Sequence, residues 1–185
     1  MTTKPLEQAI ASTRGVLAGV TKQELGNDTP CAKWKVSDLI NHIIGAQGFF
    51  TAGVTGTPLD DGDSDFAATD YVSAFEEHTG RCLTAFQGDG VMERVLTLPF
   101  GQMPGSAFVM LAATDTFTHG WDLAKATGQD TDLAPELAAA LLAGARKSIM
   151  PEFRSEEGDV FGPEKQAPSG ASNADQLAAF LGRTV

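Results

Sequence analysis

Three residues in one predicted helix have side chains that could bind a metal ion or move a proton. Asp115, His119 and Asp122 are spaced four and three residues apart within the segment 106–127. At about 100° per residue, Asp115 and His119 lie about 40° apart around the helix axis, and Asp122 lies about 20° from Asp115. An imidazole and two carboxylates therefore share one face, as metal ligands spaced i, i+4 do.

The other residues on that face are apolar or small: Phe108, Leu111, Ala112 and Ala126. We therefore expect the face to be turned toward the protein core. Burying a carboxylate or an imidazole costs free energy unless the group is paired or bound to a metal. The pattern favours a partner for Asp115 and His119 inside the molecule.

A further histidine, His42, lies on the predicted helix 37–50 beside apolar residues. Helices packed in a bundle could place it opposite Asp115 and His119, because bundle cores commonly hold such sites. Two imidazoles and one carboxylate with an open position suit catalytic zinc, non-haem iron(II) or nickel(II). His42, Asp115 and His119 are thus candidate metal ligands.

Two further acids could orient these ligands. Asp122 is near His119, and Asp38 is on the His42 side of its helix, so either could accept a hydrogen bond from a ligand imidazole. Simpler interpretations stay open. Asp115 and His119 could form only a hydrogen-bonded pair, His42 could be a paired core histidine, and Asp122 could face solvent.

The remaining histidine and the two cysteines are predicted to have no chemical role. His78 follows two glutamates and is predicted to lie on the surface. Cys31 and Cys82 are predicted to be small buried residues rather than nucleophiles. Two cysteines are too few for a disulfide framework or a cysteine-rich zinc site.

The segments that must position these residues have the apolar periodicity of helices. Four long helices are predicted at 5–21, 37–50, 67–87 and 106–127, and shorter ones at 135–149 and 173–182. Loop or coil is predicted at 51–66 and 151–172, and residues 94–103 form a small hairpin or a connector. The predicted fold is all-α. An antiparallel four-helix bundle occupies residues 1–128, and a helical and coil extension, 129–185, packs on it within one compact domain.

Composition limits the function classes. The chain has 185 residues with 24 acidic and 13 basic side chains, and its net charge is −11. This charge argues against nucleic acids and anionic membranes as partners. No apolar run is long enough to span a bilayer, and the first residues lack the apolar core of a signal peptide. We expect a soluble, cytoplasmic protein, either a monomer or a homodimer.

Several segments resemble one family. Residues 29–42 (TPCAKWKVSDLINH) and 115–124 (DTFTHGWDLA) resemble two motifs in actinobacterial relatives of mycothiol-dependent maleylpyruvate isomerase. Residues 161–163 (FGP) and 177–183 (LAAFLGR) are similar to the C-terminal pattern of the same group. These proteins belong to the DinB-like superfamily of metal-binding four-helix bundles. The resemblance runs through most of the chain.

The resemblance places the metal ligands at His42, Asp115 and His119. The isomerase has glutamate at the position of Asp115, and many DinB-like proteins have histidine there, so this chain departs from both. Its tail also does not match the substrate domain of the isomerase. The resemblance implies a divalent metal, zinc before nickel or iron, and a cosubstrate thiol such as mycothiol.

With that thiol and an electrophile as partners, the implied enzyme is a metal-dependent thiol S-transferase or an isomerase. The alternative is a module that binds a metal or a small molecule without turnover, for example in a stress response. A fold alone does not choose between them.

Overall fold

The computed structural model describes residues 2–57, 64–155 and 161–185. This part of the chain contains six α-helices and one two-stranded antiparallel hairpin. The prediction of a mostly helical chain is therefore confirmed, and of the two alternatives for residues 94–103 the structure shows the hairpin. None of the described helices is long and apolar enough to cross a membrane.

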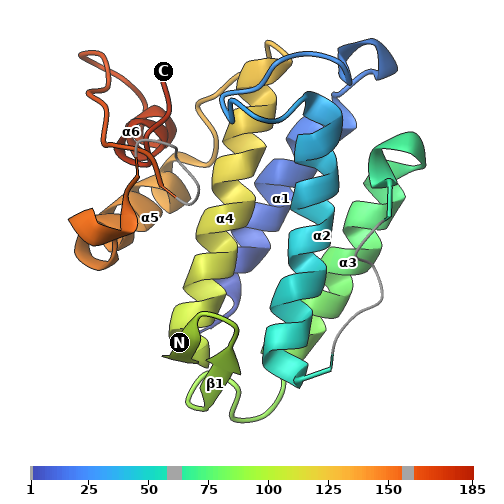
Figure 1. Ribbon diagram of the computed structural model, residues 1–185, viewed down its shortest axis with the longest axis vertical. Coiled ribbons are helices and arrows are strands. Elements are labelled where there is room, and N and C mark those ends of the chain that lie inside the picture. Colours follow the sequence, from blue (N-terminus) through green and yellow to red (C-terminus); the bar gives the residue numbers. More distant parts are fainter. Residues whose placement is uncertain (1, 58–63, 156–160) are drawn as a thin grey trace.

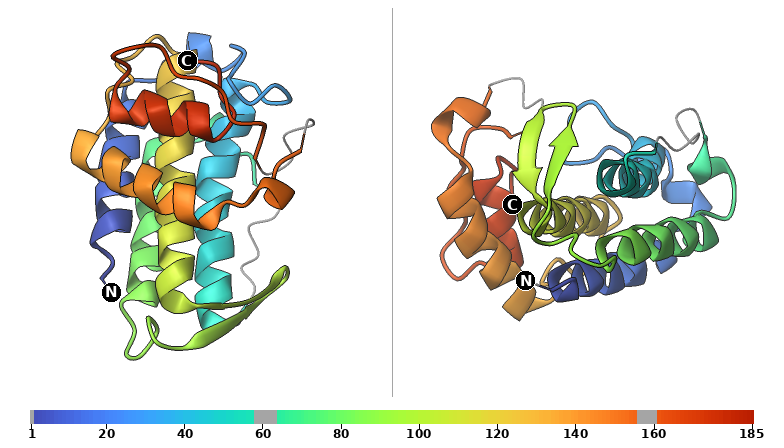
Figure 2. Two further views of the ribbon diagram at one scale, coloured as in Figure 1. Left: turned by 90° about the vertical axis from the view of Figure 1, so that its left-hand side faces the viewer. Right: turned by 90° about the horizontal axis from the view of Figure 1, so that it is seen from below.

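The four long helices lie side by side along the length of the molecule (Figure 1). They are α1 (Lys4–Ala18), α2 (Val36–Thr55), α3 (Tyr71–Phe86) and α4 (Gly105–Ala126). Each has an apolar stripe, as the sequence predicted. Seen end-on in Figure 2, α4 lies next to both α1 and α2, so its side chains can contact both helices.

The helices do not simply alternate in direction. Asn41, in the first turns of α2, donates to Asp65 Oδ1 at 3.1 Å and accepts from the backbone N–H of Ala67, just before α3 begins. At the other end, Gln87 follows α3 and donates to Glu7 in the first turn of α1 at 3.4 Å. Helices α2 and α3 therefore run in the same direction, and the predicted antiparallel order does not hold for this pair.

The reason is the length of the connection from Thr55 to Tyr71. An extended chain advances about 3.3–3.6 Å per residue, but a helix advances only about 1.5 Å per residue. A connection of this length can return along the whole of α2, whereas a short one would force an antiparallel neighbour.

Helix α2 is longer than predicted. It continues to Thr55 and ends at Gly56, whose φ is +73°. The predicted loop was therefore wrong at its start, because Gly53 was interpreted as a loop residue. A Cβ at Gly53 would lie 2.6 Å from the ring of Phe108, so this glycine lets α2 approach α4 closely. Residues 58–63 of the predicted loop, which include Asp60, Asp61 and Asp63, lie outside the described residues.

A hairpin links α3 to α4. Strand β1 (Val95–Leu98) pairs with β2 (Gly101–Pro104), with Leu96 opposite Met103, and the hairpin lies across the ends of the long helices. Helix α4 ends as predicted, with Gly128 in the left-handed region at φ +67°. The sequence therefore located both ends of this helix within about one residue.

Two shorter helices, α5 (Pro135–Ser148) and α6 (Asn173–Phe180), pack against each other beside α4 (Figure 2). The indole N–H of Trp121 donates to Asp175 Oδ1 at 2.9 Å, which joins α4 to α6. Trp121 is fully buried, so the bond anchors α6 to a core residue of α4.

His78 was predicted to lie on the surface. In the structure it is buried on α3, with 6% of its area exposed. Its ring centroid lies 5.0 Å from that of Phe66. Position 78 shares a helix face with the buried residues Phe75 and Cys82, three and four positions away. The preceding glutamates point elsewhere around the axis, so they gave the wrong indication.

Candidate metal centre

His42 on α2 meets Asp115 and His119 on α4. Asp115 Oδ1 lies 3.7 Å from His42 Nε2 and 3.6 Å from His119 Nε2. The potential ligand atoms of the three residues all lie within 4.8 Å of one another. The structure therefore brings together the three residues that the sequence selected, although two helices from distant parts of the chain contribute them.

The atoms at this site fit a divalent cation. Among the described residues, His42 Nε2 and Asp115 Oδ2 are buried without a hydrogen-bond partner. The 3.6 and 3.7 Å separations are too long for hydrogen bonds. Two ligand atoms about 2.1 Å from a tetrahedral cation are about 3.4 Å apart, which is close to this spacing. A set of two nitrogens and one oxygen suits zinc, iron or nickel.

The other ring nitrogen of His119 is held by Asp122. His119 Nδ1 lies 3.0 Å from Asp122 Oδ2, and Asp122 is fully buried. When the imidazole is neutral, Nδ1–H donates to this carboxylate, and the lone pair of Nε2 is left to face Asp115. Carboxylates orient metal-binding imidazoles in this way in many proteins.

Two residues that sequence reasoning did not assign to the site also contact Asp122. Arg183 donates from Nε to Asp122 Oδ1 at 3.2 Å and from Nη2 to Oδ2 at 2.9 Å. The Cys31 thiol donates to Oδ2 at 3.3 Å and lies 3.9 Å from His119 Nδ1. Neither residue has a local spacing signal, since both are far from residue 122 in the chain.

The two cysteines differ. Cys31 is half-buried and makes polar contacts at the site, so its interpretation as a small buried apolar residue was wrong. Cys31 lies in the turn that leads into α2, and this turn places its thiol against Asp122 on α4. Cys82 is buried as predicted, and burial raises the pKa of its thiol to about 12. Cys82 therefore stays protonated and is a poor nucleophile.

A second group of potential ligands consists of Cys31, His119 and Asp122. Asp122 is already paired with Arg183, whose positive charge opposes a cation at the same carboxylate. Within these two groups of the described residues, the buried atoms without a hydrogen-bond partner belong instead to His42 and Asp115. The first group is therefore the better candidate for a metal.

The electrostatics of the site are dominated by burial and by close opposite charges. Burial alone would lower the pKa of His119, but its hydrogen bonds to Asp122 and Cys31 and the charge of Asp115 raise that pKa to about 10. Burial raises the pKa of Asp122, yet Arg183 and His119 outweigh it and hold the pKa at about 2. Burial also opposes ionisation of Asp115, and the neighbouring histidines bring its pKa below the ordinary value.

Two further residues complete the description. The ring of Trp34 packs against both imidazoles at a tilt, with centroid separations of 4.5 Å to His42 and 5.6 Å to His119. Asp38, the other predicted orienting acid, is exposed, and its Oδ2 accepts from the backbone N–H of Lys35 at 2.9 Å. The structure therefore gives Asp38 a capping contact at the start of α2.

Comparison with known proteins identifies the family. Residues 6–124 match the mycothiol maleylpyruvate isomerase N-terminal domain. The chain belongs to this family. Two uncharacterized proteins from two strains of Mycobacterium tuberculosis are each 42% identical to it over 174 residues, which is 92% of this chain and 91% of the relative. No solved structure matches the chain.

The family match confirms the resemblance found in the sequence. It also shows which residues of the site lie within the family domain. The matched region of the mycothiol maleylpyruvate isomerase N-terminal domain family contains His42, Asp115, His119 and their neighbours Cys31 and Asp122. Arg183 lies outside the matched region. The contact between Arg183 and Asp122 thus joins the family domain to the C-terminal segment.

Proposed function

We propose that this protein binds a divalent metal ion at His42, Asp115 and His119 and uses it with a small thiol in an S-transfer or isomerisation reaction. One observation carries the proposal: two imidazoles and a carboxylate converge between α2 and α4, and they include a buried nitrogen and a buried oxygen without partners. Membership of a family named for a mycothiol-dependent isomerase supports the thiol.

A divalent cation with three protein ligands keeps a position for an outside ligand and stabilises a thiolate over the thiol. The chain supplies the surroundings. Asp122 holds the proton on His119 Nδ1, and the indole of Trp34 packs against both imidazoles. Cys82 is buried away from such a role, and the Cys31 thiol is engaged with Asp122. The attacking thiol therefore comes from solution, and mycothiol is our first candidate.

We propose zinc as the metal, with nickel and iron(II) as the alternatives. The nitrogen and carboxylate donors suit all three ions. Asp115 is one methylene shorter than the glutamate of the isomerase that the sequence resembles, which bears on the metal. The tail does not match the substrate domain of that isomerase, and the electrophile therefore need not be maleylpyruvate.

The proposed architecture is a DinB-like four-helix bundle. Helices α1 to α4, within residues 1–128, would form it, and residues 129–185 would pack against α4. A location in the cytoplasm would agree with the use of a small intracellular thiol.

Metal analysis of protein purified without a polyhistidine tag is the first test. We expect close to one equivalent of zinc, nickel or iron in the wild type and much less in His119→Ala. The second test measures turnover of a panel of electrophiles with mycothiol, before and after metal is removed. Equal rates in metal-free, metal-loaded and His119→Ala protein would exclude a metal-dependent reaction at this site. Stoichiometric metal without turnover on a broad panel would favour the alternative, a non-catalytic binding module.

A further inference from the structure

We infer that Arg183 is a positioning residue for the candidate metal centre: it holds Asp122, which in turn holds His119 in the orientation of a ligand. The C-terminal segment would then set metal affinity, although it lies outside the region that matches the family. This inference rests on the proposed function, because it assumes a metal at His42, Asp115 and His119.

The first support is the geometry of the Arg183–Asp122 pair. The guanidinium donates two hydrogen bonds, of 3.2 Å from Nε and 2.9 Å from Nη2, to the two oxygens of one carboxylate. Such a fork fixes the plane of the carboxylate as well as its position. Oδ2, which receives the 2.9 Å bond, is also the oxygen that lies 3.0 Å from His119 Nδ1. The orientation of Arg183 is therefore passed directly to the imidazole.

The second support is burial. The side chain of Asp122 is fully buried, and that of Arg183 is 13% exposed. A buried carboxylate that loses one of its charged partners is strongly destabilised, and Asp122 would keep only its contacts with His119 and the Cys31 thiol. Without Arg183, Asp122 would have to rotate toward water or rearrange against His119. Either movement would disturb the ligand nitrogen on the opposite side of the ring.

The third support is that the backbone carrying Arg183 is itself fixed. The backbone N–H of Arg183 donates to the carbonyl of Ala178 at 2.9 Å, which closes the end of α6. Gly182 has φ +98°, and a Cβ there would lie 2.7 Å from the Cα of Gly162. Only glycine fits this close crossing of two chain segments. The crossing fixes the backbone just before Arg183 and so restricts where its guanidinium can lie.

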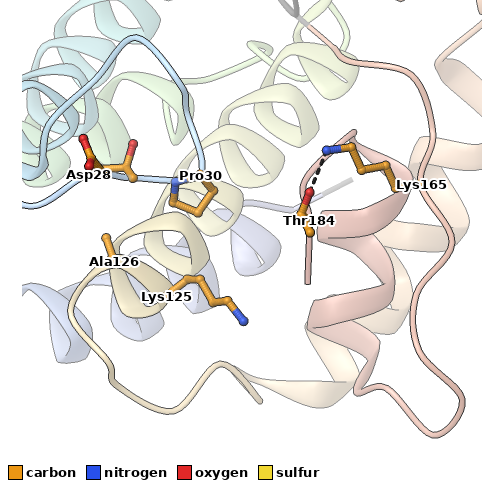
Figure 3. Close-up of a pocket in the computed structure, with 7 residues that line it drawn as sticks. Asp28, Pro30, Lys125, Ala126, Lys165 and Thr184 are labelled. Carbon is orange, nitrogen blue, oxygen red and sulfur yellow. Dashed lines mark hydrogen bonds between the residues drawn. The ribbon is translucent and has the colours of Figure 1, made fainter.

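The residue after Arg183 is held as well. Figure 3 shows Lys165 donating to Thr184 at the edge of a pocket of about 290 Å³, and the Nζ to Oγ1 distance is 2.7 Å. Pro30, which precedes Cys31, lines the same pocket. The segment that carries Cys31 and the segment that carries Arg183 therefore meet at this pocket. This arrangement agrees with a positioning function for the C-terminal segment.

The test compares zinc affinity in full-length variants by competition with a chelator of known affinity. We expect Arg183→Gln to weaken zinc binding about 10–100-fold, as loss of an orienting partner does in other sites. Arg183→Lys should recover only part of the loss, because an ammonium cannot make the two parallel bonds. Melting temperatures of the metal-free proteins are measured in parallel.

Arg154→Gln is the matched control. Arg154 also belongs to the C-terminal segment, and its Nη1 donates to the carbonyls of Gly162 and Phe180 at 2.8 Å. Its loss should lower the melting temperature and change zinc affinity far less than Arg183→Gln does, because no hydrogen bond joins Arg154 to Asp122 among the described residues. If Arg183→Gln behaves in the same way, with zinc affinity within about twofold of the wild type, Arg183 is only a structural residue and the inference is wrong.

A double-mutant cycle covers the case in which Arg183→Gln folds poorly. Asp122→Asn is combined with Arg183→Lys, and the change in zinc affinity from Arg183→Lys should nearly vanish in the Asp122→Asn background. Independent, additive effects would overturn the inference but leave the proposed function intact. Zinc binding that is equally weak in the wild type and in His119→Ala would instead refute the proposed function, and the inference with it.

Discussion

The ring centroids of His42 and His119 lie 4.6 Å apart, and the planes of the two imidazoles are nearly perpendicular at 76°. The first ring comes from α2 and the second from α4, so their spacing depends on how closely these helices approach. Gly53 and Phe108 meet at the same helix pair, and the missing Cβ of Gly53 permits that approach. The candidate metal centre is thus a property of helix packing as much as of its ligands.

Removal of one ligand imidazole should abolish metal retention. His119→Ala and His42→Ala should each lose the metal but keep the far-ultraviolet circular dichroism of a helical protein. Metal content is measured after extensive dialysis. His78→Gln is the control, since His78 lies on α3 against Phe66, and it should retain metal. Loss of metal in the control alone would place the site elsewhere.

The two acids that the sequence proposed as orienting residues should behave differently. Asp122→Asn should weaken metal binding about 10–100-fold, because it removes the charge that holds His119 Nδ1. Asp38→Asn should leave metal affinity unchanged and cost at most about 1 kcal/mol of stability through the helix cap. Isothermal titration and urea unfolding measure the two effects separately. Equal losses of affinity in both variants would contradict the assignment.

Zinc should stabilise the folded protein. A ligand that binds only the native state at 100 times its dissociation constant adds about 2.7 kcal/mol. For a chain of this size that corresponds to a rise in melting temperature of roughly 5–11 °C. Differential scanning fluorimetry with zinc, and then with excess EDTA, measures the rise and its reversal. Asp115→Asn should show little or no rise, because it removes the charged ligand without a large change in volume.

Gly120 should tolerate no side chain. It follows His119 on α4, and a Cβ there would overlap Thr13 on α1. Gly120→Ala should lower the free energy of unfolding by about 1–3 kcal/mol, the usual cost of overpacking. Gly15, on α1, has open space around its Cα, and Gly15→Ala should be neutral or stabilising by up to about 1 kcal/mol. Similar stability of the two variants would show that α1 and α4 can move apart freely.

The sequence predicted those features that are encoded locally. Apolar periodicity predicted every α-helix of the described residues to within a few positions, apart from the end of α2. That error has a physical cause, because glycine serves both loops and close helix contacts, and only the position of Phe108 distinguishes the two uses at Gly53. The direction of α3 was likewise set by a long connection rather than by any residue within the helix.

The same division applies to the site. Asp115 and His119 were found because an i, i+4 pair is visible in the sequence, and His42 because the chain has only three histidines. Cys31 and Arg183 were not assigned to the site, since their contacts with Asp122 span 91 and 61 residues. Contacts of that range follow from the packed structure and have no periodic signal.

The pairing of α1 with α4 has a consequence for how the protein is made. The hydroxyl of Thr13 donates to the carbonyl of Thr116, 103 residues later in the chain. At about 5–20 residues per second, a ribosome needs about 5–20 s to synthesise that interval. During this time the apolar face of α1 is without its main partner and is open to chaperones and to aggregation. Translation speed between these two helices should therefore affect the yield of folded protein more than it would in a bundle whose successive helices pair.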